Sequence, residues 1–425
     1  MQAPELSVSR RVAALIDASP TPFHAVETAV RELQAAGFVE LGPGEAPGVG
    51  SRFLRRGGAL VAWTVADHHE AHSPVRVVGA HTDSPNLRIK PQPDGGTGPW
   101  RQLGVEIYGG ALLNSWLDRD LGLAGRVVVR TADGPVTHLV RDDRPLLRVP
   151  QLAIHLDREI NDKGLQLNKQ RHMAPIWAVG DAPDFADYLA ELAEVDAGDV
   201  LTWDVMAHDT VPSALTGLDE QFLAAPRIDN LLSCFVGLDA LLSVQSQPGP
   251  SIPMLCLFDH EEVGSVSAAG AASPLLSDVL DRIGSALGGG LDDRAASRAA
   301  SLVVSADGAH ATHPNYAERH EPDHRIAVNA GPVLKINANQ RYATDAETAA
   351  VFTLACEHAG VPMQRFVNRT DLACGSTIGP ISAGQLGIPV VDAGCAQLAM
   401  HSAREMAGSH DPAMFLAALT ALLSA

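Results

Sequence analysis

Cysteine is scarce in this sequence. Five cysteines occur in 425 residues, an odd number with no CxxC spacing, at Cys234, Cys256, Cys356, Cys374 and Cys395. This pattern argues against a disulfide framework and against a cysteine-ligated zinc site. We therefore expect small buried side chains at these positions and a reducing, cytoplasmic location.

Basic residues are also few. The sequence has 31 Lys and Arg but 50 Asp and Glu, and its formal net charge is -19. A surface of this sign repels nucleic acid and anionic membranes, so neither is an expected partner. It also repels acidic peptides, so an acidic substrate would need a local positive group in its pocket. No uncharged apolar run approaches the ~20 residues of a membrane span. The amino-terminal MQAPELSVSRR lacks the apolar stretch of a secretory signal.

The sequence does contain the patterns of a large α/β protein. Thr21 and Pro22 predict the start of a helix that ends at Gly37. Strands are expected at 59–65 and 75–80. After about residue 226, strands are predicted at 252–258, 301–305 and 388–392, and helices near 230 and at 275–287, 344–359 and 411–424. This alternation predicts a mostly parallel sheet flanked by helices.

Between these parts, residues 87–225 have a different texture. Turn residues separate short β-type runs there, which predicts an inserted β-rich domain. The catalytic α/β domain would then consist of residues 1–86 and 226–425. Within the latter, the glycine-rich segment 284–301 is the best candidate for a mobile loop.

Polar residues that follow the predicted strands carry the chemistry. His81 and Asp83 follow one strand, Glu261-Glu262 another and Asp307 a third, while Asp229 precedes a helix. Sites in open α/β sheets lie beyond the carboxyl ends of the strands. Carboxylates gathered there would repel one another unless cations lay among them.

Each of these residues taken alone is weak evidence, because a single strand-end His or an Asp before a helix is usually structural. The Glu261-Glu262 pair is stronger, since it lies between an apolar run and Val263-Gly264. In an extended stretch, neighbouring side chains point oppositely. One glutamate could then hold a metal while the other faces a bound water.

Long motifs give the chain a specific resemblance. They run in order from about residue 19 to 406 and include GAHTDSPNLRIKP, LLNSWLDRDLGLAGRV, AIHLDREIN, RIDNL, FDHEEVGS, SADGAHATHPNY, GPVLKINANQRYAT, CGSTIGPI and MHSAREM. In these motifs the chain resembles the aspartyl aminopeptidase family. The resemblance implies hydrolysis of N-terminal Asp or Glu from peptides. It also implies a phosphorylase/hydrolase-like α/β fold whose insertion serves dimerisation.

The resemblance further implies a two-zinc centre, in which Co²⁺ or Mn²⁺ can substitute. Its implied ligands are His81 and Asp307 for one ion, Glu262 and His401 for the other, and Asp229 as the bridge. Glu261 would be the general base acting on a metal-bridging water, and Asp83 would orient His81. Imidazole and carboxylate ligands suit zinc, so the residue types agree with this assignment.

Four further positions are implied to contact substrate: His155, His310, Lys335 and Tyr342. The family pattern places His155 in the active site of a neighbouring subunit, within a homo-oligomer that we expect to be a dodecamer. Lys335 lies in the apolar run GPVLKIN, and a buried lysine needs an anionic partner. A substrate carboxylate would serve.

Other functions remain open on the sequence alone. A related metallo-aminopeptidase of broad or neutral specificity would share the ligands and differ at Lys335. A non-catalytic scaffold of the same fold, or a carboxypeptidase or deacylase on a similar two-metal fold, is also conceivable. A serine hydrolase is disfavoured, because Gly375-Ser376-Thr377 is not a GxSxG elbow.

Several histidines have no assigned role. His68, His69 and His72 suggest an exposed turn rather than a metal site, and the roles of His172 and His313 are open.

Overall fold

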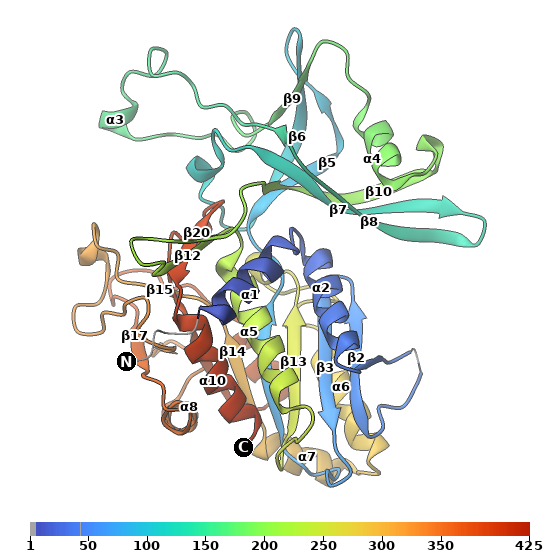
Figure 1. Ribbon diagram of the computed structural model, residues 1–425, viewed down its shortest axis with the longest axis vertical. Coiled ribbons are helices and arrows are strands. Elements are labelled where there is room, and N and C mark those ends of the chain that lie inside the picture. Colours follow the sequence, from blue (N-terminus) through green and yellow to red (C-terminus); the bar gives the residue numbers. More distant parts are fainter. Residues whose placement is uncertain (1–5, 43) are drawn as a thin grey trace. The chain divides into compact units, whose positions relative to one another are not determined.

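The computed structural model describes residues 6–42 and 44–425. Residues 1–5, which open the stretch considered above for a secretory signal, lie outside this description. Over the described residues, the chain is a mixed α/β protein with three sheets (Figure 1). It divides into two compact units, which are described separately. Within the described residues, unit 1 comprises 6–42, 44–83, 213–400 and 405–425, and unit 2 comprises 84–212 and 401–404.

Unit 1 contains a nine-stranded sheet. Its strands in spatial order are β1 (Val39–Glu40), β2 (Gly50–Arg56), β3 (Ala59–Val65), β13 (Ile252–Phe258), β4 (Val75–His81), β14 (Leu302–Ala306), β18 (Val390–Gly394), β16 (Val333–Ile336) and β17 (Gln364–Val367). The four strands β13, β4, β14 and β18 are mutually parallel. Strands β2, β3 and β16 add antiparallel pairings, so the sheet is mixed.

Helices cover both faces of this sheet. They are α1 (Ser7–Asp17), α2 (Pro22–Ala35), α5 (Ile228–Val244), α6 (Leu275–Ala286), α7 (Leu291–Ala300), α8 (Ala346–Ala359), α9 (Ile378–Leu386) and α10 (Asp411–Leu423). Alternate residues of β3 face opposite ways: Leu60 packs in the core with α1, α2, α5 and α10, whereas Val61 packs with α6 and α9 (Figure 1). Burial on both faces explains why these strands are continuous apolar runs.

Local signals account for the predicted boundaries of α2. Thr21 accepts a hydrogen bond from the backbone of His24 and Pro22 occupies the first turn, as expected. The helix ends at Ala35, and Gly37 follows with a φ of 87°. This left-handed conformation suits glycine because it has no Cβ.

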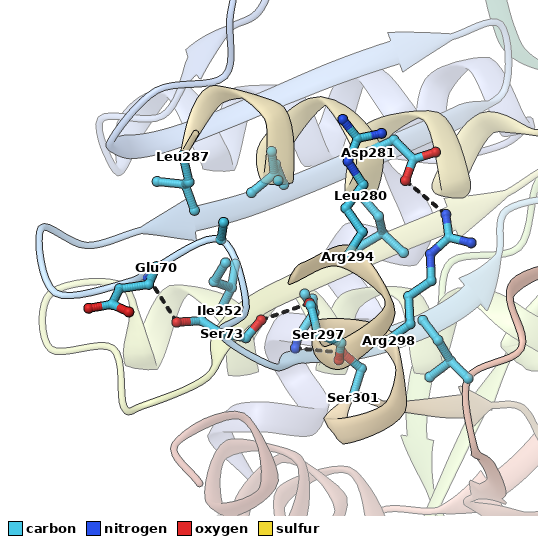
Figure 2. A pocket seen from close by; sticks show the side chains of 15 residues that line it. Glu70, Ser73, Ile252, Leu280, Asp281, Leu287, Arg294, Ser297, Arg298 and Ser301 are labelled. Carbon is cyan, nitrogen blue, oxygen red and sulfur yellow. Dashed lines mark hydrogen bonds and ion pairs between the residues drawn. The ribbon is translucent and has the colours of Figure 1, made fainter. Parts of the chain in front are cut away.

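The segment 284–301, expected to be a mobile loop, is largely helical, and that expectation was wrong. Helix α7 begins after Gly290, whose backbone N–H donates to Asp293. Figure 2 shows how α7 is held: Arg298 pairs with Asp281 of α6 at 3.0 Å, and Ser297 donates to the backbone oxygen of Ser73. The glycines precede the helix, and the alanine- and arginine-rich stretch after them has high helix propensity.

A second, five-stranded sheet also lies in unit 1. Its order is β11 (Ala214–Thr216), β12 (Phe222–Ala225), β20 (Glu405–Gly408), β19 (Ala396–Leu398) and β15 (Ala309–His310). It joins segments that are far apart in the sequence, and its strands carry two residues discussed below, Glu405 and His310.

Unit 2 is built on a six-stranded antiparallel sheet. Its order is β8 (Gly134–Leu147), β7 (Leu121–Thr131), β10 (Val200–Asp209), β5 (Asn86–Gly95), β6 (Trp100–Tyr108) and β9 (Ile176–Val179). Two helices, α3 (Ile160–Lys163) and α4 (Phe185–Ala193), complete it. The ring of Phe185 packs within 6.2 Å of those of Trp177, Tyr188 and Trp203, which gives this unit its own core.

Among the described residues, none of the helices is both long enough and apolar enough to cross a membrane.

Candidate metal centre

Parallel pairing of three strands brings the predicted site residues of unit 1 to one edge of the sheet. His81 ends β4, and its register partner is Phe258, the last residue of β13. Glu261 and Glu262 follow shortly after, and Asp307 comes directly after β14. Asp229 joins them from the first turn of α5.

Three of the predicted ligands surround a common point. His81 Nε2 lies 3.3 Å from Asp229 Oδ1 and 3.7 Å from Asp307 Oδ1, and all three residues are buried. One oxygen of Asp229 also lies within 4.8 Å of an oxygen of Glu262. Asp229 is therefore shared between His81 and Asp307 on one side and Glu262 on the other.

Asp83 contacts two parts of this site. Its carboxylate oxygens accept hydrogen bonds from the backbone N–H groups of Glu261 and Glu262, at 3.0 and 3.1 Å. The nearest Asp83 atom to His81 Nδ1 is the backbone oxygen, at 3.0 Å, and the carboxylate lies 3.4 Å away. Asp83 thus holds the backbone that carries both glutamates as well as lying beside the imidazole.

The two glutamates were expected on an extended stretch, and that expectation was wrong. Residues Glu261–Val263 form a 3-10 turn, with His260 and Gly264 in left-handed conformations on either side. The turn exposes consecutive N–H groups to one acceptor, the carboxylate of Asp83. Successive side chains on such a turn still diverge, since it has about three residues per turn.

The buried acidic groups shift the pKa values of their neighbours. Burial by itself lowers the pKa of His81, but hydrogen bonds with Asp229, Asp307 and Asp83 outweigh it and raise that pKa well above its usual value. Burial raises the pKa of Glu261 to about 7, against the opposing effect of His81. So many buried carboxylates require cationic partners. A zinc ion fits this donor set of imidazole and carboxylate groups.

Two supporting contacts were not anticipated from the sequence. Glu405 Oε2, at the start of β20, accepts the backbone N–H of Asp229 at 2.8 Å. The thiol of Cys234 donates to the backbone oxygen of His81 at 2.9 Å. Glu405 falls inside the motif MHSAREM, four residues after His401, which is the one sequence signal that could have singled it out.

Three of the predicted substrate residues, Lys335, Tyr342 and His310, form a cluster in unit 1 around Phe366. Lys335 is 1% exposed, and its Nζ lies 3.3 Å from Asp307 Oδ2 and 5.0 Å from the ring centroid of Tyr342. The rings of His310 and Tyr342 each lie 6.3 Å from Phe366, a residue that the sequence did not suggest. The anionic partner that Lys335 requires is therefore present on its own chain.

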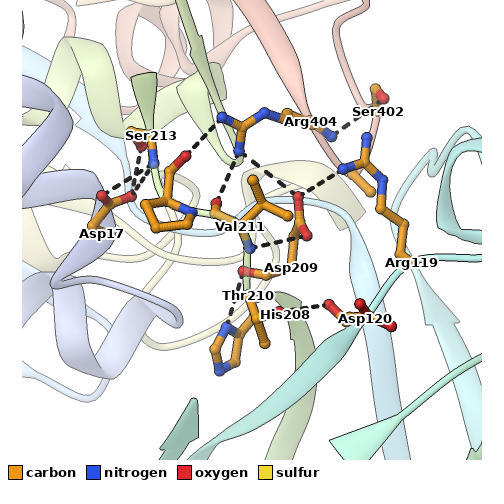
Figure 3. A network of polar contacts seen from close by, with 12 residues as sticks. Asp17, Arg119, Asp120, His208, Asp209, Thr210, Val211, Ser213, Ser402 and Arg404 are labelled. Atoms are coloured by element: carbon orange, nitrogen blue, oxygen red, sulfur yellow. Dashed lines mark hydrogen bonds and ion pairs between the residues drawn. The ribbon is translucent and has the colours of Figure 1, made fainter. Parts of the chain in front are cut away.

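His401 and His155 belong to unit 2. His401 Nδ1 lies 3.2 Å from the backbone oxygen of Gly110. In the network of Figure 3, Arg404 donates to the backbone oxygens of Val211 and Pro212, at 2.9 and 2.7 Å. These contacts hold the short segment 401–404 on unit 2. His155 is exposed in unit 2.

The unassigned histidines take part in local contacts. His68 and His69 both bond to the backbone oxygen of Gly249, at 2.9 and 3.0 Å. The ring of His172 accepts the N–H of Asn168. Within the described residues, no group of three ligand-type side chains includes these histidines, His72 or His313.

Known proteins resemble the chain over nearly its whole length. Residues 15–422 match the family model described as Aminopeptidase I zinc metalloprotease (M18). A probable M18 family aminopeptidase 2 from Streptomyces coelicolor is 52% identical over 415 residues, covering 96% of this chain and 95% of that protein.

Solved structures are similar as well. One chain of the cryo-EM structure of the Ape4 and Nbr1 complex is similar with a TM-score of 0.94 and 34% identity, over 98% of this chain and 85% of that one. The S. cerevisiae mApe1 dodecamer gives a TM-score of 0.85 and 26% identity, over 98% and 96% of the two chains.

Proposed function

We propose that this chain, which belongs to the M18 family of zinc metallo-aminopeptidases, removes N-terminal Asp or Glu from peptides. Its site would use two zinc ions for this reaction. The observation that carries the two-ion proposal is the position of Asp229. Its carboxylate lies within 4.8 Å of ligand atoms of His81 and Asp307, and also within 4.8 Å of Glu262. A carboxylate so placed can bridge two cations.

His81, Asp229 and Asp307 would hold one ion, and Asp229, Glu262 and His401 the other. Bound zinc would supply a Lewis acid for the scissile carbonyl and a lowered pKa for the attacking water. Glu261 would take a proton from that water and deliver it to the departing amine. The water oxygen would form the new C–O bond as Glu261 takes the proton, and the C–N bond would break as Glu261 passes that proton to the amine nitrogen.

The pKa of Glu261 supports its role as the base. Burial raises this pKa to about 7. A general base works best when its pKa lies near the operating pH, because it then both accepts and releases a proton readily. Asp83 would keep Glu261 in place through the hydrogen bond from the Glu261 N–H.

Specificity for an acidic N-terminal residue would come from the cluster of Lys335, Tyr342 and His310. The net charge of -19 opposes an acidic substrate, so a local cation has to select it. Lys335 is the buried cation of this cluster. A charge-assisted hydrogen bond in a desolvated pocket contributes roughly 1.5–3 kcal/mol.

One observation favours the alternative, an aminopeptidase of broad or neutral specificity. Lys335 Nζ is already paired with Asp307 Oδ2 at 3.3 Å and donates to the backbone oxygen of Gly308 at 3.1 Å. If those contacts persist when substrate binds, less of the lysine charge is available to a substrate carboxylate. A substrate panel distinguishes the two functions.

We expect peptides and chromogenic substrates with N-terminal Asp or Glu to be cleaved about ten- to a hundredfold better than those with Leu or Ala, measured as kcat/KM. Lys335→Met should flatten this preference, mainly by lowering the rates on acidic substrates. Zinc content is measured alongside, because Lys335 also contacts Asp307.

Lys163→Met is the matched control, since Lys163 is an exposed lysine paired with Glu159 in unit 2. It should leave the preference unchanged. A wild-type enzyme that cleaves Leu as fast as Asp would refute acid specificity and leave the two-metal centre standing. A preference that survives in Lys335→Met would direct attention to His310.

We also propose a homo-oligomer, a dodecamer like that of the mApe1 relative, in a reducing cytoplasm. The five cysteines are free thiols, four of them buried, which supports this location. The exposed His155 would act in the site of a neighbouring subunit.

Mixed assembly tests the role of His155. His155→Ala and Glu261→Gln are each expected to be nearly inactive, and co-assembled subunits should regain activity, because some interfaces then pair an intact His155 with an intact Glu261. The measurement is specific activity after co-expression, with subunit mixing verified by native mass spectrometry. Absence of recovery in proven mixed oligomers would show that His155 does not act in trans.

A further inference from the structure

A buried carboxyl group that the proposed mechanism does not use is hydrogen-bonded to the segment that follows Tyr342. Asp392 belongs to β18, between β14 and β16, and is 0% exposed. A carboxyl group in such a place is costly unless hydrogen bonds or opposite charge compensate it. The residues that compensate Asp392 therefore indicate what it holds in place.

Three hydrogen bonds link Asp392 to the segments that contain Ala343 and Thr377. Its carboxyl oxygens accept from Thr377 Oγ1 at 2.5 Å and from the backbone N–H of Ala343 at 2.6 Å. Its own backbone N–H donates to Thr344 Oγ1 at 2.9 Å. The packing is tight: a Cβ added to Gly379 would come within 2.3 Å of the carboxyl.

Two of these bonds fix the segment that carries Tyr342. Ala343 and Thr344 follow Tyr342 directly, and both are hydrogen-bonded to Asp392. The N–H of Ala343 donates to the Asp392 side chain, and the backbone N–H of Asp392 donates to the Thr344 hydroxyl. Tyr342 lies outside the helices and strands, so no regular backbone hydrogen bonding of a helix or strand holds it. Tyr342 is therefore held on its backbone side by these two neighbours, while its ring packs against Phe366.

The same carboxyl group acts on Lys335. Strands β16 and β18 are antiparallel with Leu334 opposite Ala393, so Lys335 and Asp392 occupy the next positions along the register. Burial raises the pKa of Asp392, and the charge of Lys335 works against that rise. The lysine thus lies in the field of two buried acids, Asp307 and Asp392.

We propose that Asp392 is a positioning residue for recognition of the substrate's N-terminal side chain. It fixes Tyr342 through Ala343 and Thr344, and it restrains Lys335 by charge. This inference rests on the proposed acid specificity. It assigns Asp392 no contact with substrate or metal, so its removal should alter selectivity more than turnover.

Asp392→Asn tests the proposal, because the amide keeps the shape and removes the charge. The kcat/KM ratio for Asp over Ala substrates is expected to fall about tenfold, mainly through a higher KM for the acidic substrate. The kcat for the Ala substrate and the zinc content should stay within about twofold of wild type.

Asp411→Asn is the matched control. Asp411 is also 0% exposed, accepts two backbone N–H groups, from Asn329 at 2.7 Å and Gly331 at 3.0 Å, and begins α10. Burial raises its pKa as well, to about 7. This variant is expected to change stability and leave the Asp-to-Ala ratio as in wild type.

Thr377→Val is the second variant, for use if Asp392→Asn does not fold. It removes one donor to Asp392 and should lower the ratio in the same direction by a smaller factor. An unchanged ratio in a folded variant would overturn the proposal, as would loss of zinc or an equal loss on both substrates. A wild type without any acid preference would overturn the proposed function itself, and this inference with it.

Discussion

Replacing Glu261 with glutamine is expected to lower kcat by about two to four orders of magnitude while the bound metal is retained. Glutamine has the size of glutamate but cannot accept a proton from water near pH 7. Glu261 is the glutamate whose pKa burial raises to about 7, whereas Glu262 is the one whose oxygen lies near Asp229. The roles proposed for the two neighbours can therefore be separated by mutation.

Steady-state kinetics together with metal analysis of the same preparation measures this effect. Glu262→Gln is the matched control, because it makes the same chemical change one residue further on. It should lose zinc as well as activity, since it removes an anionic ligand. Retained metal in Glu262→Gln together with lost metal in Glu261→Gln would mean that the two assignments are reversed.

Removal of metal by a chelator is expected to abolish activity, and adding back Zn²⁺, Co²⁺ or Mn²⁺ should restore it. His81, Asp229 and Asp307 bring two carboxylates and an imidazole together in a buried part of unit 1, and Lys335 lies 3.3 Å from Asp307 Oδ2. Carboxylate and imidazole sites accept several divalent metals, with selectivity governed by geometry and availability.

A chelation series at fixed enzyme concentration measures the loss, and metal analysis counts the ions restored per subunit. Two ions per subunit are expected at full recovery. His81→Ala serves as the comparison, because added metal should not restore it. Full activity in a preparation shown to be free of metal would refute the proposed mechanism.

The sequence was most informative where an element's signal is local. The strand Ala59–Val65 and the start of α2 at Pro22 lie where the apolar runs and the Thr21 cap predicted them. Parallel strands must also end at a common edge, so His81 and Asp307 could be expected to meet. The long motifs added the family, which the match over residues 15–422 confirmed.

The errors occurred where local patterns were ambiguous. The three glycines before Leu291 suggested a loop through residue 301, but a helix begins immediately after them. The Glu261-Glu262 pair was assigned to an extended stretch because it follows a strand. An acceptor from a distant part of the chain, Asp83, stabilises a turn there instead.

Composition and motifs of contiguous residues were enough to predict the class of the protein, its aminopeptidase family and the residue types of a zinc site. The residues that support that site could be identified only from the folded chain. Glu405 reaches Asp229 and Asp392 reaches Ala343 across separations of 176 and 49 residues. Such contacts arise from packing between distant segments, so the sequence around each residue does not identify its partner. The structure likewise decided that Lys335 has an acidic partner in Asp307, because burial makes an unpaired lysine too costly.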